Sequence, residues 1–239
     1  MTPLNAAAAA EFQYVGSELD LFEKAVNWKR YWSRKIAPFV SADVLEVGAG
    51  IGANTRLLIR ATPFRSWTCL EPDASLVART SVSGPGIHMI HGAVADLPPN
   101  AAFDSILYID VLEHIGDDRA ELARASALLN PGGHLIVQSP AHQFLFTPFD
   151  SAIGHFRRYS RATLAAAAPR ELHPCTLEYL DAAGMLASLG NRMLLSQSMP
   201  TERQILLWDR TLVPLSRMVD PWFGGRLGKS VLGVWRREH

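Results

Sequence analysis

Residues 44–52 constrain the fold of this chain more than any other segment, because an apolar run leads directly into closely spaced glycines. The segment reads VLEVGAGIG, and its glycines are Gly48, Gly50 and Gly52. Glycine has no Cβ, so the backbone can turn tightly here and a ligand can approach it closely. The pattern is typical of a first parallel strand that ends in a nucleotide-binding turn. Residues 53–60 then predict a helix whose free amide groups face that ligand.

Beyond this turn, strand-like and helix-like segments alternate along the chain. The predicted strands are 43–47, 66–70 with Glu71 at the end, 87–90, 103–109, 134–138, 175–180 and 231–236. The predicted helices are 118–129 with Asp118 and Glu121 as a capping pair, 161–168, 182–195, and 202–219 with a kink at Pro214. The sequence NPGG at 130–133 should end the first of these helices and turn the chain. This alternation predicts an α/β fold, a Rossmann-like, doubly wound, seven-stranded and mostly parallel sheet with helices on both faces.

Helical cap elements are expected at both ends of this fold. Leu21, Ala25, Trp28, Trp32 and Ile36 recur every three or four residues, which predicts one amphipathic helix or two short ones. We therefore expect a flexible tail over 1–16 and a single domain over 17–239. The parts of that domain are a helical cap at 17–40, a cofactor-binding core at 41–139, an acceptor-binding and cap region at 140–230, and the last strand at 231–239.

The composition limits the partners and the compartment. The chain has 239 residues with 23 basic and 23 acidic side chains, and this balance argues against a nucleic-acid partner. Only Cys69 and Cys175 are present, which favours a reducing compartment and a cytoplasmic location. No secretory signal or membrane-spanning run is expected. No histidine pair has metal-binding spacing, so no metal site is predicted.

With these segments in place, the chain resembles the class I S-adenosylmethionine-dependent methyltransferases. Four segments carry the resemblance in the right order, namely VLEVGAGIG at 44–52, LEPD at 70–73, FDSILYIDVLEHI at 103–115 and LLNPGGHLIV at 128–137. The resemblance covers about residues 40–160 well and the rest loosely. It implies that the cofactor is S-adenosylmethionine and that the chain is a methyltransferase.

The resemblance also assigns cofactor-binding residues. In that family the acid at the end of the second strand, here Glu71, binds the two ribose hydroxyls, and a carboxylate is a strong acceptor for such a pair. The loop after the third strand normally supplies a carboxylate to the adenine amino group, but this chain has Ala93 there. Asp96 is expected to lie too far along the chain to reach the adenine, so the backbone of Val94 is expected to contact it. The full expected set is Glu46, Gly48, Ala49, Gly50, Gly52, Glu71, Pro72, Ala93, Val94, Asp110, Val111 and His114.

The methyl acceptor should be bound by the long loop at 140–160 and the region that follows it. Similar methyltransferases carry an Asp and then Gly-His-x-Arg-Arg-Tyr, which are here Asp150 and residues 154–159. Among several candidates for the general base (His114, His142, His155, Asp110 and Asp150), we favour His155, because ligands bind beyond the carboxyl ends of open α/β sheets. The expected catalytic residues are His155, His114 and Asp150. The expected substrate-binding residues are His142, Phe146, Arg157, Arg158, Tyr159 and Tyr31.

Several alternatives stay open at this point. Asp150 and the Arg-Arg-Tyr residues could form a structural clamp, or an arginine could hold an anionic group of the acceptor. The apolar region 140–228 predicts a fairly apolar small-molecule acceptor, methylated at oxygen. The apolar seam of 205–219 is best explained by helix packing, with a cap over the acceptor, a homodimer face and a peripheral membrane contact as alternatives. The glycine pattern also fits an NAD(P)-dependent oxidoreductase, and a non-catalytic cofactor-binding homologue is the third candidate.

Overall fold

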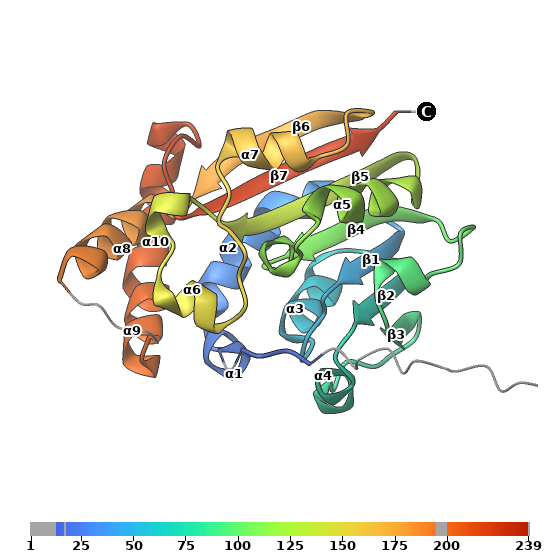
Figure 1. The fold of residues 1–239 in the computed structure, drawn as a ribbon, viewed down its shortest axis with the longest axis horizontal. Helices are drawn as coiled ribbons and strands as arrows, with labels where there is room; N and C mark the ends of the chain where they lie inside the picture. The colour runs from blue at the N-terminus through green and yellow to red at the C-terminus, as the bar shows by residue number, and fades with distance from the viewer. Residues whose placement is uncertain (1–12, 17, 195–199, 239) are drawn as a thin grey trace, which may run out of the picture.

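A seven-stranded sheet forms the centre of the computed structural model, which describes residues 13–16, 18–194 and 200–238. The strand order is β3-β2-β1-β4-β5-β7-β6 (Figure 1). β7 runs antiparallel to both of its neighbours, and the other neighbouring strands are parallel. The predicted fold class is thereby confirmed.

The elements are connected in the expected alternation. The strands are β1 (Asp43–Val47), β2 (Ser66–Glu71), β3 (Ile87–His91), β4 (Phe103–Ile109), β5 (Leu129–Pro140), β6 (Leu172–Leu180) and β7 (Ser230–Arg237). The α-helices are α1 (Leu19–Phe22), α2 (Val26–Ile36), α3 (Ala53–Ala61), α4 (Ala74–Arg79), α5 (Asp118–Ala127), α6 (Pro148–Ala152), α7 (Arg161–Ala167), α8 (Ala182–Leu194), α9 (Glu202–Leu207) and α10 (Val213–Val219). Short 3₁₀ turns are η1 (Ala37–Phe39), η2 (Val94–Asp96), η3 (Leu112–His114), η4 (Gln143–Leu145) and η6 (Asp220–Phe223), and η5 (Trp208–Leu212) is a π-helical turn.

Helices cover both faces of the sheet, because successive strand residues point to opposite sides. Leu45 of β1 packs into a core with Leu122 of α5 and Leu164 of α7, the two helices in front of the sheet in Figure 1. Its neighbour Val44 packs into a second core with Trp32 of α2, behind the sheet. Among the described residues, no helix has the length and apolar content that a membrane crossing requires.

The strand β5 differs most from its prediction. Asn130 and the two glycines after Pro131 do not form a turn outside the sheet but belong to a strand that starts at Leu129. A register shift between Phe103 and Ser105 absorbs the extra residues, and Asn130 Nδ2 donates to Asp104 Oδ1 at 2.8 Å. The side-chain amide of Asn130 therefore holds the start of β5 against the start of β4.

The start of α5 also corrects a prediction. The N-cap is Asp117, whose side chain accepts a hydrogen bond from the amide of Ala120, and Asp118 is the first helical residue. The Asp118 carboxylate instead accepts from the Tyr159 hydroxyl at 2.6 Å. The predicted N-cap of α5 thus lies one residue too late in the sequence.

The C-terminal helices contain a π-helical turn in place of a simple kink at Pro214. Ile205 and Trp208 are buried as the predicted seam requires, but after η5 the buried side chains are Val213 and Ser216. A π turn holds one residue more than an α turn, so the buried stripe moves by one position. As a consequence Leu215 of the predicted seam points to solvent.

The N-terminal cap consists of the two short helices α1 and α2, one of the two arrangements that the sequence allowed. Trp28 and Trp32 are core residues, and the Trp28 ring lies 5.8 Å from the Trp208 ring. The predicted tail lies outside the described residues up to position 12, but Tyr14 and Val15 are packed against the site described next.

Candidate active site

The glycine turn after β1 and the end of β2 form one hydrogen-bonded unit. Gly48, Gly50 and Gly52 all have positive φ angles, of 65°, 56° and 75°. The Gly50 amide donates to Glu71 Oε2 at 2.7 Å, and the Asp73 amide donates to Glu71 Oε1 at 3.0 Å. Burial raises the pKa of Glu71, and these two amide donors oppose that shift. The structure therefore places the predicted ribose-binding carboxylate beside the glycine turn.

The loop after β4 packs directly on this turn. A Cβ at Gly48 would lie 2.6 Å from a methyl carbon of Val111, so only glycine leaves room for that side chain. Asp110 has a φ of +55° and is held by the Gln138 side-chain amide, which donates to Asp110 Oδ1 at 2.9 Å. Neighbouring protein atoms raise the pKa of Asp110 to about 6, and its side chain is exposed to solvent.

The loop after β3 contains a carboxylate that the sequence analysis placed too far away. The 3₁₀ turn η2 brings Asp96 back, and the Ala93 amide donates to Asp96 Oδ2 at 2.8 Å. This turn was not predicted, which is why the two positions were treated as separate. Asp96 is therefore a further candidate for the adenine side of the site, next to Ala93 and Val94.

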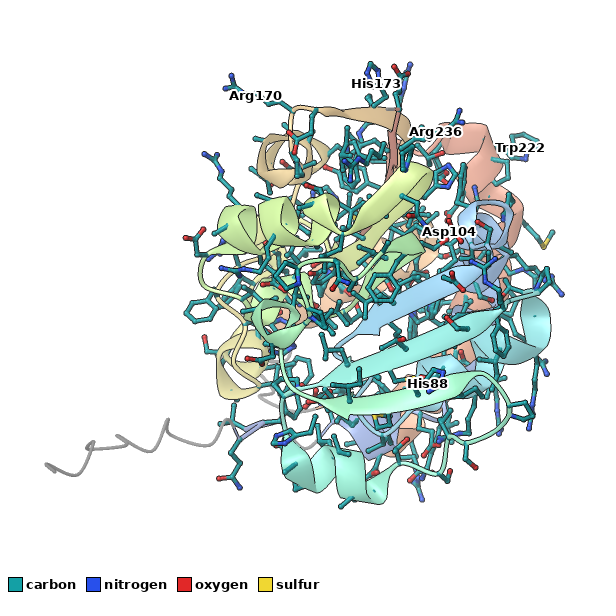
Figure 2. All side chains as sticks on the ribbon, turned by 90° about the vertical axis from the view of Figure 1, so that its right-hand side faces the viewer. His88, Asp104, Arg170, His173, Trp222 and Arg236 are labelled. Carbon is teal, nitrogen blue, oxygen red and sulfur yellow. The ribbon has the colours of Figure 1, made fainter. Side chains whose placement is uncertain are left out.

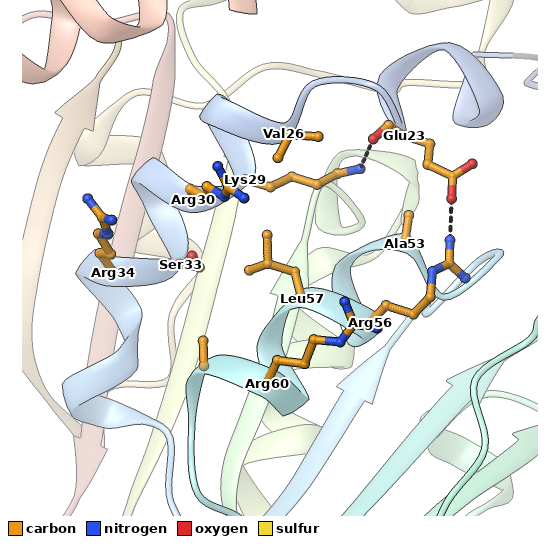
Figure 3. Close-up of a pocket in the computed structure, with 11 residues that line it drawn as sticks. Glu23, Val26, Lys29, Arg30, Ser33, Arg34, Ala53, Arg56, Leu57 and Arg60 are labelled. Atoms are coloured by element: carbon orange, nitrogen blue, oxygen red, sulfur yellow. Dashed lines mark hydrogen bonds and ion pairs between the residues drawn. The ribbon is translucent and has the colours of Figure 1, made fainter.

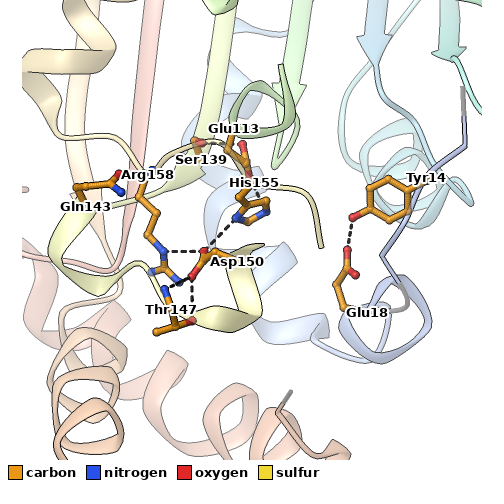
Figure 4. A network of polar contacts seen from close by, with 9 residues as sticks. All are labelled: Tyr14, Glu18, Glu113, Ser139, Gln143, Thr147, Asp150, His155 and Arg158. Atoms are coloured by element: carbon orange, nitrogen blue, oxygen red, sulfur yellow. Dashed lines mark hydrogen bonds and ion pairs between the residues drawn. The ribbon is translucent and has the colours of Figure 1, made fainter. Parts of the chain in front are cut away.

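A second polar cluster surrounds His155 (Figure 4). His155 Nδ1 lies 3.0 Å from Asp150 Oδ1, and Arg158 donates to both carboxylate oxygens of Asp150 at 2.8 and 3.0 Å. Burial alone would raise the pKa of Asp150, but the hydrogen bonds from His155 and Arg158 outweigh it and hold that pKa below its ordinary value. Because Asp150 is an ionised acceptor, the proton of the pair lies on Nδ1, which leaves Nε2 as the free ring nitrogen.

The free nitrogen of His155 faces a buried acid from the loop after β4. Glu113 Oε1 lies 3.8 Å from His155 Nε2 and has no hydrogen-bond partner, whereas Glu113 Oε2 accepts from the Ser139 hydroxyl at 2.7 Å. Burial, followed by the charge of Asp110, raises the pKa of Glu113 to about 7. The pKa of His155 is also raised, because Asp150 and Glu113 outweigh its burial.

His114 completes this cluster. Its ring centre lies 4.5 Å from that of His155, and burial and the nearby His155 charge lower the pKa of His114 to about 3. One ligand-type atom from each of Glu113, His114 and His155 lies within 4.8 Å of the others. The structure therefore brings together three side chains that could hold a cation, although the sequence predicted no metal site.

The N-terminal segment covers this cluster, which the sequence analysis missed. The Tyr14 amide donates to Asp73 Oδ2 at 2.6 Å, and the Tyr14 ring lies 5.4 Å from the His114 ring. The Tyr14 hydroxyl donates to Glu18, whose other oxygen is buried without a hydrogen-bond partner. No sequence pattern marks Tyr14, because its contacts with Asp73 and His114 join positions far apart in the chain.

Three of the predicted acceptor-binding residues are occupied by internal contacts. Arg157 forms an ion pair with Asp118 at 2.7 Å, the Tyr159 hydroxyl donates to the same carboxylate, and Arg158 is bound to Asp150. Among the alternatives, the geometry favours the structural clamp for these three.

The remaining predicted acceptor-binding residues make separate contacts. The Tyr31 hydroxyl donates to Asp220 at 2.7 Å, between α2 and the C-terminal helices. His142 Nε2 lies 3.0 Å from the Gly228 carbonyl oxygen, and the His142 ring lies 4.5 Å from the Tyr179 ring. Phe146 is half-buried in the loop before α6. Among the described residues, no hydrogen bond or ring contact joins these three side chains to His155.

Glu46 is held on the α3 side of the sheet. Its carboxylate accepts from Trp67 Nε1 at 2.9 Å and is buried. Burial raises the pKa of Glu46 to about 7, and hydrogen bonds from Thr55 and Trp67 oppose this shift. The contacts of this side chain are therefore to the core around α3.

A separate groove of about 660 Å³ lies between α2 and α3 (Figure 3). Its charged lining residues are Lys29, Arg30, Arg34, Arg56, Arg60 and Glu23. Burial lowers the pKa of Lys29 to about 8, which reflects an ammonium group with little solvent around it. Because five of these six charges are positive, the groove repels a sulfonium cation, and we do not assign the cofactor to it.

The surroundings of the carboxyl ends of β1, β2 and β4 have the opposite charge. Glu18 and Glu113 each carry a buried carboxylate oxygen without a hydrogen-bond partner, and Asp110 faces solvent beside them. Buried carboxylate oxygens without a donor are costly, and cationic groups satisfy them well. S-adenosylmethionine carries a sulfonium and an ammonium group, so these residues fit that cofactor.

Comparisons with known proteins agree with this geometry. A family model described as a methyltransferase domain matches residues 20–175. A "probable S-adenosylmethionine-dependent methyltransferase" of Mycolicibacterium smegmatis is 30% identical over 150 residues, which are 62% of this chain and 56% of that protein. A demethylmenaquinone methyltransferase of Tropheryma whipplei is 29% identical over 162 residues, 66% of this chain and 65% of that protein. The chain thus matches only about 56% to 65% of the length of these relatives.

A solved structure shares the fold. The N-methyltransferase NodS of Bradyrhizobium japonicum, in complex with S-adenosyl-L-homocysteine, superposes with a TM-score of 0.57 at 15% identity over 90% of this chain and 89% of that one. The match of the methyltransferase family model, which covers more than half of the sequence, leaves the oxidoreductase alternative without support. This chain belongs to the family of S-adenosylmethionine-dependent methyltransferases.

Proposed function

We propose that this chain transfers the methyl group of S-adenosylmethionine to a hydroxyl oxygen of a small, fairly apolar acceptor, with His155 as the general base. The observation that carries the proposal is the Asp150–His155 pair at 3.0 Å, which leaves His155 Nε2 free in a buried cluster beside the loop after β4. S-adenosylmethionine supplies an activated methyl group when it is bound.

The residues of the chain position the reactants and move one proton. Glu71 and the turn at Gly48, Gly50 and Gly52 would hold the adenosyl and methionine parts of the cofactor. His155 Nε2 takes the proton of the acceptor hydroxyl as that oxygen attacks, and Asp150 stabilises the resulting imidazolium. Since Arg158 fixes Asp150 at both oxygens, the imidazole ring is held in one orientation.

The apolar character of the acceptor is supported by the aromatic residues around α6. The Phe22 ring lies 6.4 Å from Phe149 and 6.3 Å from Trp208, and Phe149 directly precedes Asp150. One relative is named for demethylmenaquinone, so the reduced quinol form of that compound, which carries hydroxyl groups, is among the acceptors to test. We also propose a biosynthetic role in the cytoplasm, which the unpaired Cys69 and Cys175 support.

The test is methyl transfer from labelled S-adenosylmethionine to a panel of apolar hydroxyl compounds, including phenols and quinols. With an acceptor in hand, we expect His155→Ala to lower kcat/KM by about 100-fold or more. In the wild-type chain kcat/KM should rise with pH through a pKa above the ordinary histidine value, because only unprotonated His155 accepts a proton. His155→Ala should lack this rise.

His114→Gln is the matched control, because His114, with a pKa of about 3, is already neutral at neutral pH and its loss should leave the rise in place. A loss of less than about threefold for His155→Ala would exclude the base role. Activity should also persist in EDTA, and its loss there would assign Glu113, His114 and His155 to a cation instead. A non-catalytic homologue would bind S-adenosylhomocysteine and methylate no acceptor.

A further inference from the structure

The C-terminal helices expose large apolar side chains on one ridge, which we call the apolar crest. It consists of Leu186 on α8, Leu215 and Met218 on α10, and Trp222 and Phe223 on η6. Trp222 is 90% exposed, Met218 72% and Leu186 68%. Figure 2 shows Trp222 standing clear of the ribbon at the margin of the molecule. Exposed side chains of this size, gathered on adjoining helices, mark a surface that contacts something apolar.

The crest results from the π-helical turn η5. Because the buried positions after the turn are Val213 and Ser216, the residues Leu215, Met218 and Trp222 fall on the outer side at spacings of three and four. A groove of about 290 Å³ runs along the crest, and all of its lining residues are apolar: Ala182, Ala183, Leu186, Leu215, Val219, Trp222 and Phe223. The outer stripe thus continues from α10 to its neighbour α8.

Positive charges predominate along these helices, because the acids that flank them, Glu178 and Glu202, are paired with Lys35 and Lys24. Between positions 203 and 229 the only acids are Asp209 and Asp220, and both are buried and bound to backbone amides. Arg203, Arg210, Arg217 and Arg226 are exposed, and none of them has an ion-pair partner among the residues that the structure describes. The surface of these helices therefore combines apolar side chains with unneutralised cations.

We propose that the apolar crest docks on an anionic lipid bilayer, with Trp222 and Met218 entering the interface and the arginines meeting lipid phosphates. A helix that carries an apolar stripe and basic flanks binds in this way, through buried apolar area and through attraction to anionic headgroups. Tryptophan prefers the boundary between headgroups and acyl chains because its ring is amphipathic.

A second copy of the chain is a poorer occupant of the same surface. In a two-fold dimer the crest meets a second copy of itself, so the exposed arginines of both chains, Arg217 and Arg226 among them, would be brought together at one interface. An anionic bilayer supplies the missing negative charge. Charge complementarity therefore selects the bilayer over the homodimer that the sequence left open.

The crest lies on the same edge of the sheet as the active site. Ser230, at the start of β7, pairs with Pro140 at the carboxyl end of β5 and with Leu180 at the end of β6. The helices between β6 and β7 therefore start and finish at the edge where β1 and β4 also end. Docking would bring this edge toward the bilayer, but it does not depend on the proposed reaction.

The test is flotation of the full chain with vesicles. We expect binding to vesicles made of equal parts phosphatidylcholine and phosphatidylglycerol, and much weaker binding to phosphatidylcholine alone. Met218→Ser with Trp222→Ser should lower the partition coefficient about tenfold or more, because both side chains are exposed and their loss leaves the core intact. Arg217→Glu with Arg226→Glu should lower it to a similar extent on anionic vesicles only.

Arg119→Glu with Arg170→Glu is the charge-matched control, since these exposed arginines lie outside the C-terminal helices and should leave binding unchanged. Equal binding by the wild-type chain and both crest variants would overturn the proposal. The proposal would also be overturned if the wild-type chain did not bind the vesicles, or if light scattering showed a dimer that Trp222→Ser dissociates. Because no acceptor is used, these results are independent of the test of methyl transfer.

Discussion

We propose two roles for Glu71 at a single position. Both of its oxygens accept backbone amide hydrogens, from Gly50 and Asp73, and its place at the end of β2 is where the family binds the ribose hydroxyls. Each carboxylate oxygen has a second lone pair, so holding the glycine turn does not exhaust its capacity. The residue that shapes the turn is thereby also available to the cofactor.

Replacing Glu71 with Gln should weaken the binding of S-adenosylhomocysteine. The amide retains only one acceptor oxygen, and its NH₂ group opposes an amide donor, so we expect the dissociation constant to rise about 10- to 100-fold. Isothermal titration measures it, with the exposed Glu202→Gln as the control. An unchanged affinity in a folded Glu71→Gln protein would remove Glu71 from the cofactor site.

At the scale of elements, α2 depends on a residue far away in the sequence. Its N-cap, Ala25, has no side chain that can accept a hydrogen bond. Asp209 of the π turn takes that place, accepting from the amides of Asn27 at 3.1 Å and Trp28 at 2.8 Å. The carboxylate also complements the positive end of the helix dipole. The N-terminal cap and the C-terminal helices are thus fastened to each other.

Asp209→Ala should destabilise the folded chain by about 2–4 kcal/mol, because it leaves buried amide donors without an acceptor. Asp209→Asn keeps an acceptor oxygen, so it should lower the free energy of unfolding by clearly less than Asp209→Ala does. Urea unfolding at neutral pH compares the two variants. Equal losses for Ala and Asn would show that the charge of Asp209, and not hydrogen bonding to α2, stabilises this junction.

The elements that could be predicted from the sequence are those with long apolar runs. β1 and β4 begin and end where they were predicted, because buried parallel strands are continuously apolar. The short turn η2 and the helix α4 were not predicted, since they depend on local caps such as Asp73, which accepts from the Ser75 amide at 2.7 Å. The buried positions after η5 could not be predicted either, because the apolar pattern of the sequence does not indicate a π turn.

The residues of the candidate site could be predicted from the sequence to a similar extent. Strand ends fixed Glu71, Asp110 and the loop after β4, since the carboxyl ends of parallel strands meet at one edge. A motif marked Asp150 and His155 as candidates, but it indicated neither their pairing nor the contact of His155 with Glu113. That contact depends on how a long loop folds back across the sheet, and no local pattern encodes it.

At the scale of the whole molecule, a net charge of zero conceals a strong separation of charge. Acids gather near the carboxyl ends of β1, β2 and β4, and cations gather on the α2–α3 groove and on the C-terminal helices. Opposite fields on different faces steer ligands of opposite sign. A net charge of zero therefore does not describe the charge of a single face, and it argues against a nucleic-acid partner only for the molecule as a whole.

Buried acids also set the pH dependence of stability. The pKa of Glu46 is raised from about 4.5 to about 7 in the folded chain. Between these values the folded state keeps a proton that the unfolded state has released, so stability falls as pH rises through this window. Glu46→Gln should lack this part of the fall, on the order of 2 kcal/mol between pH 5 and 8. Urea unfolding at both pH values measures it, and an equal pH dependence in both proteins would contradict the assignment.

The strap formed by Tyr14, Val15 and Leu19 touches both halves of the reaction centre. The Tyr14 amide donates to Asp73, the Tyr14 ring contacts His114 edge-on, and Leu19 approaches Gly50. We propose that a donor bound beside Asp73 and Gly50 leaves only when these contacts break, which would also uncover His155. On this proposal, opening of the N-terminal segment and release of the product are one event, and a mutation that loosens Tyr14 would speed both.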